Sequence, residues 1–154
     1  MRRSNSGISP VVATVILVAI AIVIAIAVAF WASGLVGVFT RFEKIEITAA
    51  YYDVSNDYVV LRVKNTGSAS ATIDDVYVNG IPEGQTNYAI EAPPSGTSCT
   101  IGTGAVNATC APGQAVEIHV TALPDGSDFI SGVTYEFAVH TASGKTYPAA
   151  VLIP

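Results

Sequence analysis

The chain has 154 residues, of which 51% are hydrophobic and only 12% are charged, and its formal net charge is −5. Three basic residues follow Lys44 against eleven acidic ones, so the C-terminal part has a net charge near −8. An acidic domain of this kind repels a phosphate backbone, which excludes nucleic acid as a partner. About 110 residues follow the apolar N-terminal part, which is enough for one globular domain.

An apolar segment dominates the first quarter of the chain. Residues 4–40 carry no charged side chain, and Thr14 is the only polar residue between Val11 and Phe30. These twenty residues, as a helix, would cross a hydrocarbon core of roughly 30 Å. The whole charge-free span would reach roughly 55 Å, so we expect something besides lipid to cover part of it. We predict a helix over residues 8–42.

A cleaved secretory signal peptide is the first alternative for this segment. The apolar region of such a peptide usually covers about 7 to 15 residues and ends at a small-x-small site. Here the apolar run continues through Trp31 and Leu35, which favours a retained helix. Because Arg2 and Arg3 precede it, we expect the N-terminus in the cytoplasm and the chain after Arg41 outside the cell.

Small residues recur at every fourth position of the predicted helix. Such rows let helix backbones approach closely, so we predict that this one packs against other helices. Alanine is frequent in the segment, and a row arising by chance is the alternative. The row consists of Ala21, Ala25, Ala29, Ser33 and Gly37.

The rest of the chain has the alternation and the β-branched residues of strands. We predict that residues 58–64 pair with 71–78 across a turn at Asn65-Thr66-Gly67, and that 142–145 form a hairpin turn. Residues 80–114 are expected to form loops with one or two short strands. The predicted strands are 45–48, 58–64, 71–78, 115–121, 133–141 and 146–153. This spacing predicts an immunoglobulin-like β-sandwich, and hence an α+β chain.

Two cysteines flank one of these loops. If the domain is extracellular, a disulfide between Cys99 and Cys110 is favoured and should stabilise by about 3 kcal/mol; two free thiols are the alternative. Two cysteines alone cannot make a four-ligand zinc site, and we expect no metal and no cofactor. In the same loop, Asn107-Ala108-Thr109 is an N-glycosylation acceptor, although such tripeptides often arise by chance.

No catalytic motif is present in the sequence, and we expect that the chain is not an enzyme. His119 and His140 lie in predicted strands without a nucleophile motif. Residues 125–128 resemble a calcium loop but lack its ligand spacing, so we predict a turn. Asp74-Asp75 is expected to be an exposed corner. Five tyrosines are either an adhesive surface or ordinary core and rim residues: Tyr51, Tyr52, Tyr58, Tyr77 and Tyr88.

The N-terminus resembles that of archaeal type IV pilins. The residues that carry the resemblance are Arg2-Arg3, a short polar stretch, Gly7, and then Ile-Ser-Pro-Val-Val-Ala-Thr-Val-Ile-Leu-Val-Ala from Ile8. It covers about the first 35 residues. The resemblance implies a class III signal peptide, cut by a prepilin peptidase between Gly7 and Ile8. Bacterial relatives have a glutamate where this chain has Val12, and archaeal members commonly lack it. Archaellins are neighbours in the superfamily, but the Ile-Ser-Pro-Val-Val start is closer to the pilin form.

The resemblance also implies a division of the chain and a function. Residues 1–7 would be the leader, 8–42 the membrane anchor and later the filament core, and 45–154 the extracellular sandwich. The chain would be a pilin that polymerises with its own copies into an adhesive surface filament. The implied partners are a prepilin peptidase, a pilus assembly ATPase and a membrane platform. The alternative is an uncleaved, single-pass anchor for an extracellular binding domain.

Overall fold

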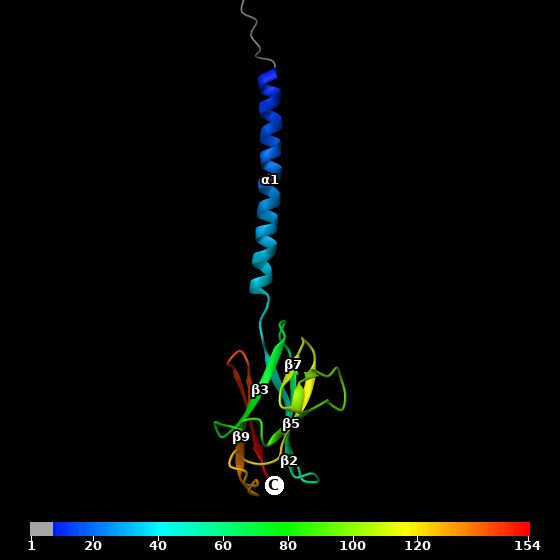
Figure 1. Cartoon of the computed structure of the whole chain (residues 1–154), viewed down its shortest axis with the longest axis vertical. Helices are drawn as coiled ribbons and strands as arrows, with labels where there is room; N and C mark the ends of the chain where they lie inside the picture. The colour runs from blue at the N-terminus through cyan, green and yellow to red at the C-terminus, as the bar shows by residue number, and fades with distance from the viewer. Residues whose placement is uncertain (1–7) are drawn as a thin grey trace, which may run out of the picture. The chain divides into compact units, whose positions relative to one another are not determined.

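The computed structural model of the chain describes residues 8–154 (Figure 1). The chain divides into two compact units, with the boundary between Arg41 and Phe42. The first contains one helix and the second contains all the strands. The predicted α+β architecture, a long apolar helix followed by a β-sandwich of two antiparallel sheets, is therefore confirmed.

The helix α1 (Ile8–Phe39) is 32 residues long and ends three residues before the predicted boundary at residue 42. Pro10 lies in the first turn, where its missing N–H has no helical partner to lose. Gly34 and Gly37 lie inside α1 without interrupting it. At about 1.5 Å per residue, a helix of this length extends over about 48 Å.

The second unit is a sandwich of two antiparallel sheets. The smaller sheet has four strands in the order β1-β2-β8-β5. Their bounds are β1 (Ile45–Asp53), β2 (Tyr58–Asn65), β8 (Ala115–Val120) and β5 (Tyr88–Glu91). The larger sheet has the order β10-β9-β3-β7-β6, with β4 also paired to β3. Their bounds are β10 (Thr146–Leu152), β9 (Thr134–Thr141), β3 (Ala71–Val78), β7 (Ala108–Cys110), β6 (Thr100–Ile101) and β4 (Ile81–Pro82).

Two predictions about the strands were wrong. Residues 58–64 do not pair with 71–78, because β2 lies between β1 and β8 and β3 belongs to the other sheet. Residues 80–114 hold four short strands rather than one or two, and a 3-10 turn, η1 (Thr103–Ala105), lies among them. Strand β1 extends to Asp53, beyond the predicted end at residue 48. The prediction ended too early because a register shift between Ile47 and Ala49 breaks the alternation of the side chains.

The core lies between the two sheets and uses every second residue of the long strands. In β2 the side chains of Val59, Leu61 and Val63 are fully buried, and in β9 those of Phe137 and Val139 are. All the residues of this core cluster come from residues 45–153. The second unit therefore has a hydrophobic core of its own.

Candidate functional site

The surface of α1 is apolar and exposed along its described length. Every described side chain from Pro10 to Gly37 is exposed, including large ones such as Leu17 and Phe30, which is 76% exposed. The span Pro10–Gly37 is 28 residues long and is long and apolar enough to cross a membrane. An exposed surface of this size on a single chain indicates that lipid or protein covers it in use.

Two polar side chains of α1, Thr14 and Ser33, are satisfied within the helix. The Thr14 hydroxyl donates to the carbonyl of Val11 at 2.8 Å, and the Ser33 hydroxyl donates to the carbonyl of Phe30 at 3.0 Å. A polar group without a partner is costly in an apolar environment, and these two hydroxyls need none from outside. The helix can therefore lie in lipid or among other apolar helices without losing a hydrogen bond.

The predicted row of small residues lies on this exposed helix. A shallow groove lies in the C-terminal half of α1, where the small side chains of Ala29 and Ser33 adjoin the larger Ile26 and Phe30. The relief of small next to large side chains is what close helix packing uses. Packing through this row stays a prediction. The row runs through Ala21, Ala25, Ala29, Ser33 and Gly37.

The predicted leader cleavage site falls at the edge of the described chain. Gly7 lies outside the described residues, and Ile8 is the first residue of α1. Cleavage between them stays a prediction.

The start of the sandwich is held by a loop, in an arrangement that we call the linker clamp. The carbonyls of Phe42 and Lys44 accept four hydrogen bonds of 2.9–3.1 Å from the amides of residues 66–69. The Phe42 amide in turn donates to the Ser68 hydroxyl at 3.0 Å. The clamp, formed by residues 42–44 and 66–69, fixes where the chain enters the sandwich.

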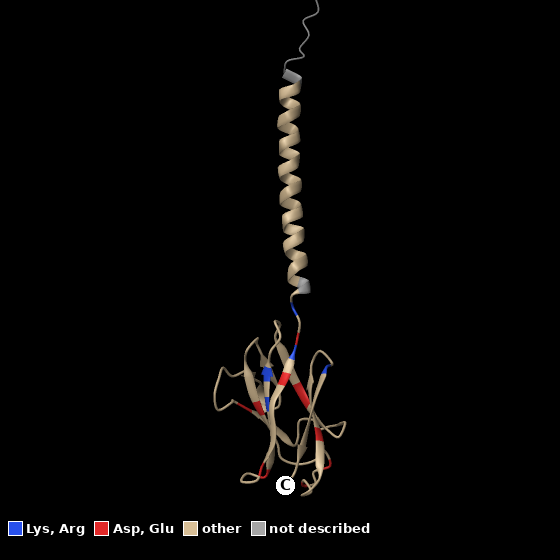
Figure 2. Ribbon diagram, turned by 180° about the vertical axis from the view of Figure 1, so that it is seen from behind, with Lys and Arg blue, Asp and Glu red and all other residues tan. Residues whose placement is uncertain are grey.

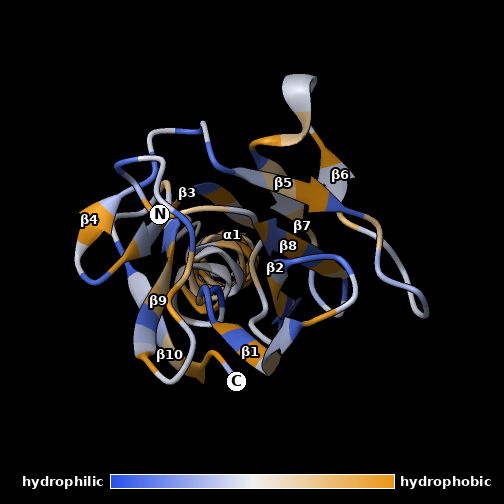
Figure 3. Ribbon diagram, turned by 90° about the horizontal axis from the view of Figure 1, so that it is seen from below, coloured by the Kyte–Doolittle hydropathy of each residue, from blue (hydrophilic) through white to orange (hydrophobic). Residues whose placement is uncertain are grey.

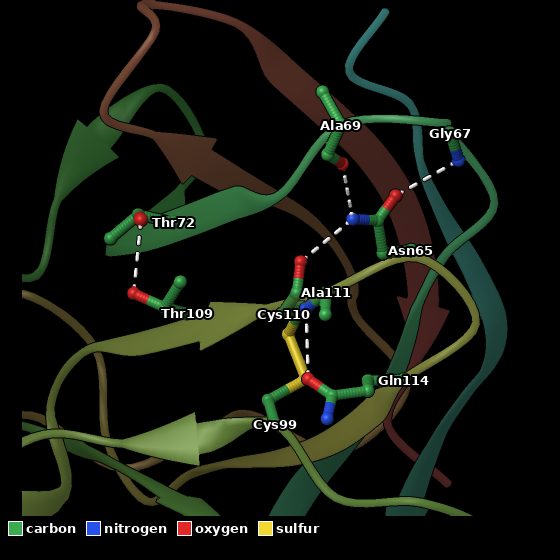
Figure 4. The surroundings of a disulfide bond; sticks show 9 residues. All are labelled: Asn65, Gly67, Ala69, Thr72, Cys99, Thr109, Cys110, Ala111 and Gln114. Carbon is green, nitrogen blue, oxygen red and sulfur yellow. Dashed lines mark hydrogen bonds between the residues drawn. A yellow bond between two sulfur atoms is a disulfide. The ribbon is translucent and has the colours of Figure 1, made fainter. Parts of the chain in front are cut away.

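Asn65, which is fully buried, connects the linker clamp to the cysteines (Figure 4). Its amide nitrogen donates to the carbonyls of Ala69 and Cys110, at 2.8 and 2.7 Å. Its side-chain oxygen accepts a hydrogen bond from the amide of Gly67, 2.9 Å away. Both donors and the oxygen of one side chain thus take part in hydrogen bonds that join two loops.

Cys99 and Cys110 are joined by a disulfide with a sequence separation of 11. Cys110 ends β7 in the larger sheet, whereas the amide of Cys99 donates to the carbonyl of Ala115 in the smaller one, at 3.1 Å. The bond therefore ties the two sheets together near the linker clamp (Figure 4).

Asn107, the predicted glycosylation site, is half-buried. Its side-chain oxygen packs directly on the backbone of Gly102, so that a Cβ at Gly102 would overlap with it. The carbonyl of Asn107 also accepts a 2.8 Å hydrogen bond from the Gly102 amide. Glycosylation of Asn107 stays a prediction.

The two histidines lie on different sheets, each stacked on a tyrosine. His119 of β8 stacks on Tyr58 at 4.4 Å between ring centroids, and its Nε2 lies 3.5 Å from the Glu117 carboxylate. His140 of β9 stacks on Tyr77, and its Nδ1 lies 2.6 Å from the Asp74 carboxylate. The histidines therefore interact with separate partners and form no pair.

The five tyrosines do not form one surface. Tyr88 is buried, and its hydroxyl donates to the carbonyl of Val106 at 2.8 Å. Burial raises the pKa of Tyr88 well above its usual value. Tyr52 is half-buried against Phe129, at 6.3 Å between ring centroids. Of the five, only Tyr51 is exposed.

Residues 125–128 form a turn rather than a cation loop. The Asp125 carboxylate accepts hydrogen bonds from the amide and the hydroxyl of Ser127, at 2.9 and 2.6 Å. These bonds lower the pKa of Asp125. Within residues 8–154, no group of three or more histidine, cysteine or acidic side chains could hold a metal ion.

Glu83 is a buried carboxyl that sequence reasoning missed. It is 4% exposed, and neither of its carboxyl oxygens has a hydrogen-bond partner among the described residues. Burial raises the pKa of Glu83 to about 7, and the charges of Asp75 and Asp125 add to the rise, while the Asn87 side chain opposes it. No local pattern marks Glu83, because a glutamate after a short Ile-Pro strand ordinarily lies in solvent.

Comparison with known proteins gives similarity to solved structures only. No protein family matches the chain, and no curated protein does. The archaellum periplasmic stator protein FlaG from Sulfolobus acidocaldarius is 21% identical, with a TM-score of 0.43, over 71% of this chain and 99% of that one. A flagellar-like filament is 13% identical, with a TM-score of 0.40, over 94% of this chain and 98% of that one. The archaeal flagellum of Methanospirillum hungatei is 16% identical, with a TM-score of 0.43, over 99% and 94%. At these values the likeness does not distinguish one role from another.

Proposed function

We propose that the chain is a structural subunit of an extracellular filament of the type IV pilus kind, in which copies pack their α1 helices into a common core. The observation that carries the proposal is the surface of α1, which is apolar on all sides and has its hydroxyls satisfied internally. Lipid of roughly 30 Å covers only part of a helix of about 48 Å. Other copies of the same helix offer an equally apolar cover for all of it.

The steps before assembly follow from the resemblance of the N-terminus to archaeal type IV pilins. The precursor lies in the cell membrane until a prepilin peptidase cuts between Gly7 and Ile8. An assembly ATPase and a membrane platform then transfer the helix from lipid into the growing filament. This transfer exchanges one apolar environment for another, so that it requires no desolvation of charge. The sandwiches form the outer layer, and the filament serves adhesion.

We also propose that the chain has no catalytic activity. The histidines, which are the side chains best suited to proton transfer near neutral pH, lie on different sheets and are stacked on Tyr58 and Tyr77. Incubating the purified protein with generic ester, phosphate and glycoside substrates should give no turnover above the rate with buffer.

An uncleaved membrane anchor is the second candidate. It is favoured by the span Pro10–Gly37, which is long and apolar enough to cross a membrane without any partner helix. In that case the sandwich would be a binding domain held at the cell surface.

The N-terminus of the native protein separates the two candidates. Intact mass or N-terminal sequencing of protein isolated from cells should give a chain that begins at Ile8, and electron microscopy should show fibres that contain it. A chain that still begins at Met1 and occurs only as detergent-solubilised single copies would refute the filament and support the anchor.

A further inference from the structure

Three lysines gather at one end of the sandwich, beside the acidic residues Glu43 and Glu46, and among the described residues they form no ion pair. Lys44 belongs to the linker clamp, Lys64 lies opposite Glu46 in the sheet, and the Lys145 ammonium donates to the carbonyl of Glu43 at 3.1 Å. Among the described residues, the ion pairs of the sandwich involve only Arg62 and the histidines. With the side chain of Phe42, which is 55% exposed, these lysines form what we call the linker end.

The opposite end has the reverse charge and a larger apolar surface. Val54, Ile130 and Leu152 are 60–71% exposed there. The contact between Tyr52 and Phe129 links the segment of Val54 to that of Ile130, and Leu152 pairs with Thr134 at the start of β9. We call this the distal end; Figure 3 views the sandwich from this side.

The distal end has acidic side chains and no lysine or arginine. Asp128 precedes the segment of Ile130, and Glu136 points to the same exposed face of the larger sheet as Leu152. No hydrogen bond or ion pair engages either carboxylate within residues 8–154, whereas Asp53 and Asp125 are occupied by their own turns. Figure 2 shows basic residues together with acidic ones toward the end at which the chain enters the sandwich, and only acidic residues in the turns of the distal end.

We propose that the distal end of one copy binds the linker end of another. Each end combines exposed apolar side chains with charges that form no ion pair among the described residues; at the linker end the three lysines outnumber Glu43 and Glu46, whereas the charged side chains of the distal end are all acidic. Pairing Asp128 and Glu136 with Lys64 and Lys145 of a second copy satisfies all four charges, while Phe42 is covered by apolar side chains. Complementary charge of this kind sets the orientation and the partner of a contact.

The occupant is a second copy because the same chain carries both complementary surfaces. The two surfaces are different, so the contact is head-to-tail and does not close on itself; repeated, it gives an open fibre. The inference thus deepens the proposed filament by assigning the contact between sandwiches. The contact itself requires only two copies, whatever the helices do.

Charge reversal tests the contact in the full chain, purified in a nonionic detergent and studied by sedimentation velocity at low ionic strength. The variant Lys64→Glu/Lys145→Glu has two negative ends, and the variant Asp128→Lys/Glu136→Lys has two positive ends. Each alone should lower the association constant about tenfold or more relative to the unaltered chain. Raising the salt to about 0.5 M should weaken association of the unaltered chain, since the paired charges are screened.

The decisive test is whether the association between copies can be restored. An equimolar mixture of the two variants, and the chain with all four reversals, should regain the association of the unaltered chain. Glu91→Lys, an exposed charge reversal away from both ends, should change nothing. Association that ignores all reversals, or variants that fail to recover on mixing, would overturn the proposal in favour of contacts through the helices or with a different partner.

The same variants separate this proposal from the filament. If the unaltered chain forms fibres whose number and salt stability the reversals leave unchanged, the head-to-tail contact is wrong and the filament stands. If no fibres form but the reversals and their mixture behave as stated, the contact stands and the filament is wrong.

Discussion

Gly67 lies against the backbone of Phe42 so closely that a Cβ at Gly67 would come within 2.5 Å of the Phe42 carbonyl oxygen and 2.6 Å of the Lys44 amide nitrogen. Real Cβ atoms essentially never approach a backbone atom this closely, and backbone cannot rotate away as a side chain can. The linker clamp therefore depends on the absence of a side chain at residue 67.

Replacing Gly67 by alanine should open the linker clamp. Residues 42–44 would separate from 66–69 and lose several hydrogen bonds, so we expect a loss of about 2–4 kcal/mol in the free energy of unfolding. Urea unfolding of the full chain in detergent, followed by circular dichroism of the sandwich, measures it. Gly144→Ala is the matched control: it has a φ of +82° but open space around it, and should cost only about 1 kcal/mol. Equal losses for the two variants would contradict the steric account.

Asn65 should be as sensitive as Gly67, for a different reason. Asn65→Ala leaves the carbonyls of Ala69 and Cys110 without their donor in a buried site, which should cost about 2–3 kcal/mol. Asn65→Asp keeps the shape but removes both donors and buries a charge, so it should destabilise at least as much. Asn56→Ala, in an exposed turn, is the control and should cost well under 1 kcal/mol. A harmless Asn65→Asp would show that the two donated bonds do not stabilise the fold.

Removal of the disulfide should destabilise the sandwich without unfolding it. Closing a loop with a sequence separation of 11 lowers the entropy of the unfolded chain, which corresponds to about 3 kcal/mol. The double variant Cys99→Ala/Cys110→Ala should lose about this amount, and urea unfolding with and without a reductant measures it independently. A reductant that shifts the double variant as much as the unaltered chain would show that the effect does not come from this bond.

Stability should fall as the pH rises through the range in which Glu83 ionises. Its pKa is raised from 4.5 to about 7 in the folded chain, so the folded state binds more protons than the unfolded state between these values. The contribution of the neutral carboxyl is complete below about pH 4.5 and is lost above about pH 7, a change of about 3 kcal/mol at most.

Glu83→Gln removes this titration while keeping the shape. The variant should be more stable than the unaltered chain at pH 8, and the difference should shrink or reverse at pH 5. Urea midpoints at several pH values measure this, with the exposed Glu136→Gln as control. A Glu83→Gln chain whose pH dependence matched that of the unaltered chain would mean that this carboxyl is ionised when folded.

The long strands could be predicted from the sequence because side-chain alternation determines which residues face a core. The bounds predicted for β3, 71–78, are those found, and β9 and β10 form the expected hairpin. Alternation identifies a face but not a neighbour, so it could not show that β2 pairs with β1 and β8. Strands such as β6 are too short to have a period, and they depend on pairing and the nearby disulfide.

The candidate site could likewise be predicted only in part. The apolar run from Val11 to Phe30, in which Thr14 is the only polar residue, can be recognised from the sequence alone, because a membrane or a core of packed helices requires apolar residues along a continuous segment. The linker clamp, the Asn65 hydrogen bonds and the burial of Glu83 are long-range consequences of how the two sheets meet. No local spacing records them.

A charge on the small-residue row of α1 should prevent polymerisation. Ala25 belongs to this row and lies near the middle of the apolar span. In Ala25→Glu a carboxylate would have no partner among packed apolar helices, which costs several kcal/mol for each subunit. We expect fibres to be absent by electron microscopy while the sandwich, whose core lies in residues 45–153, keeps its urea midpoint. The control is Ala92→Glu, which adds the same charge at an exposed position of the sandwich next to Glu91 and should leave fibres intact. Normal fibres from Ala25→Glu would contradict a filament core built from α1.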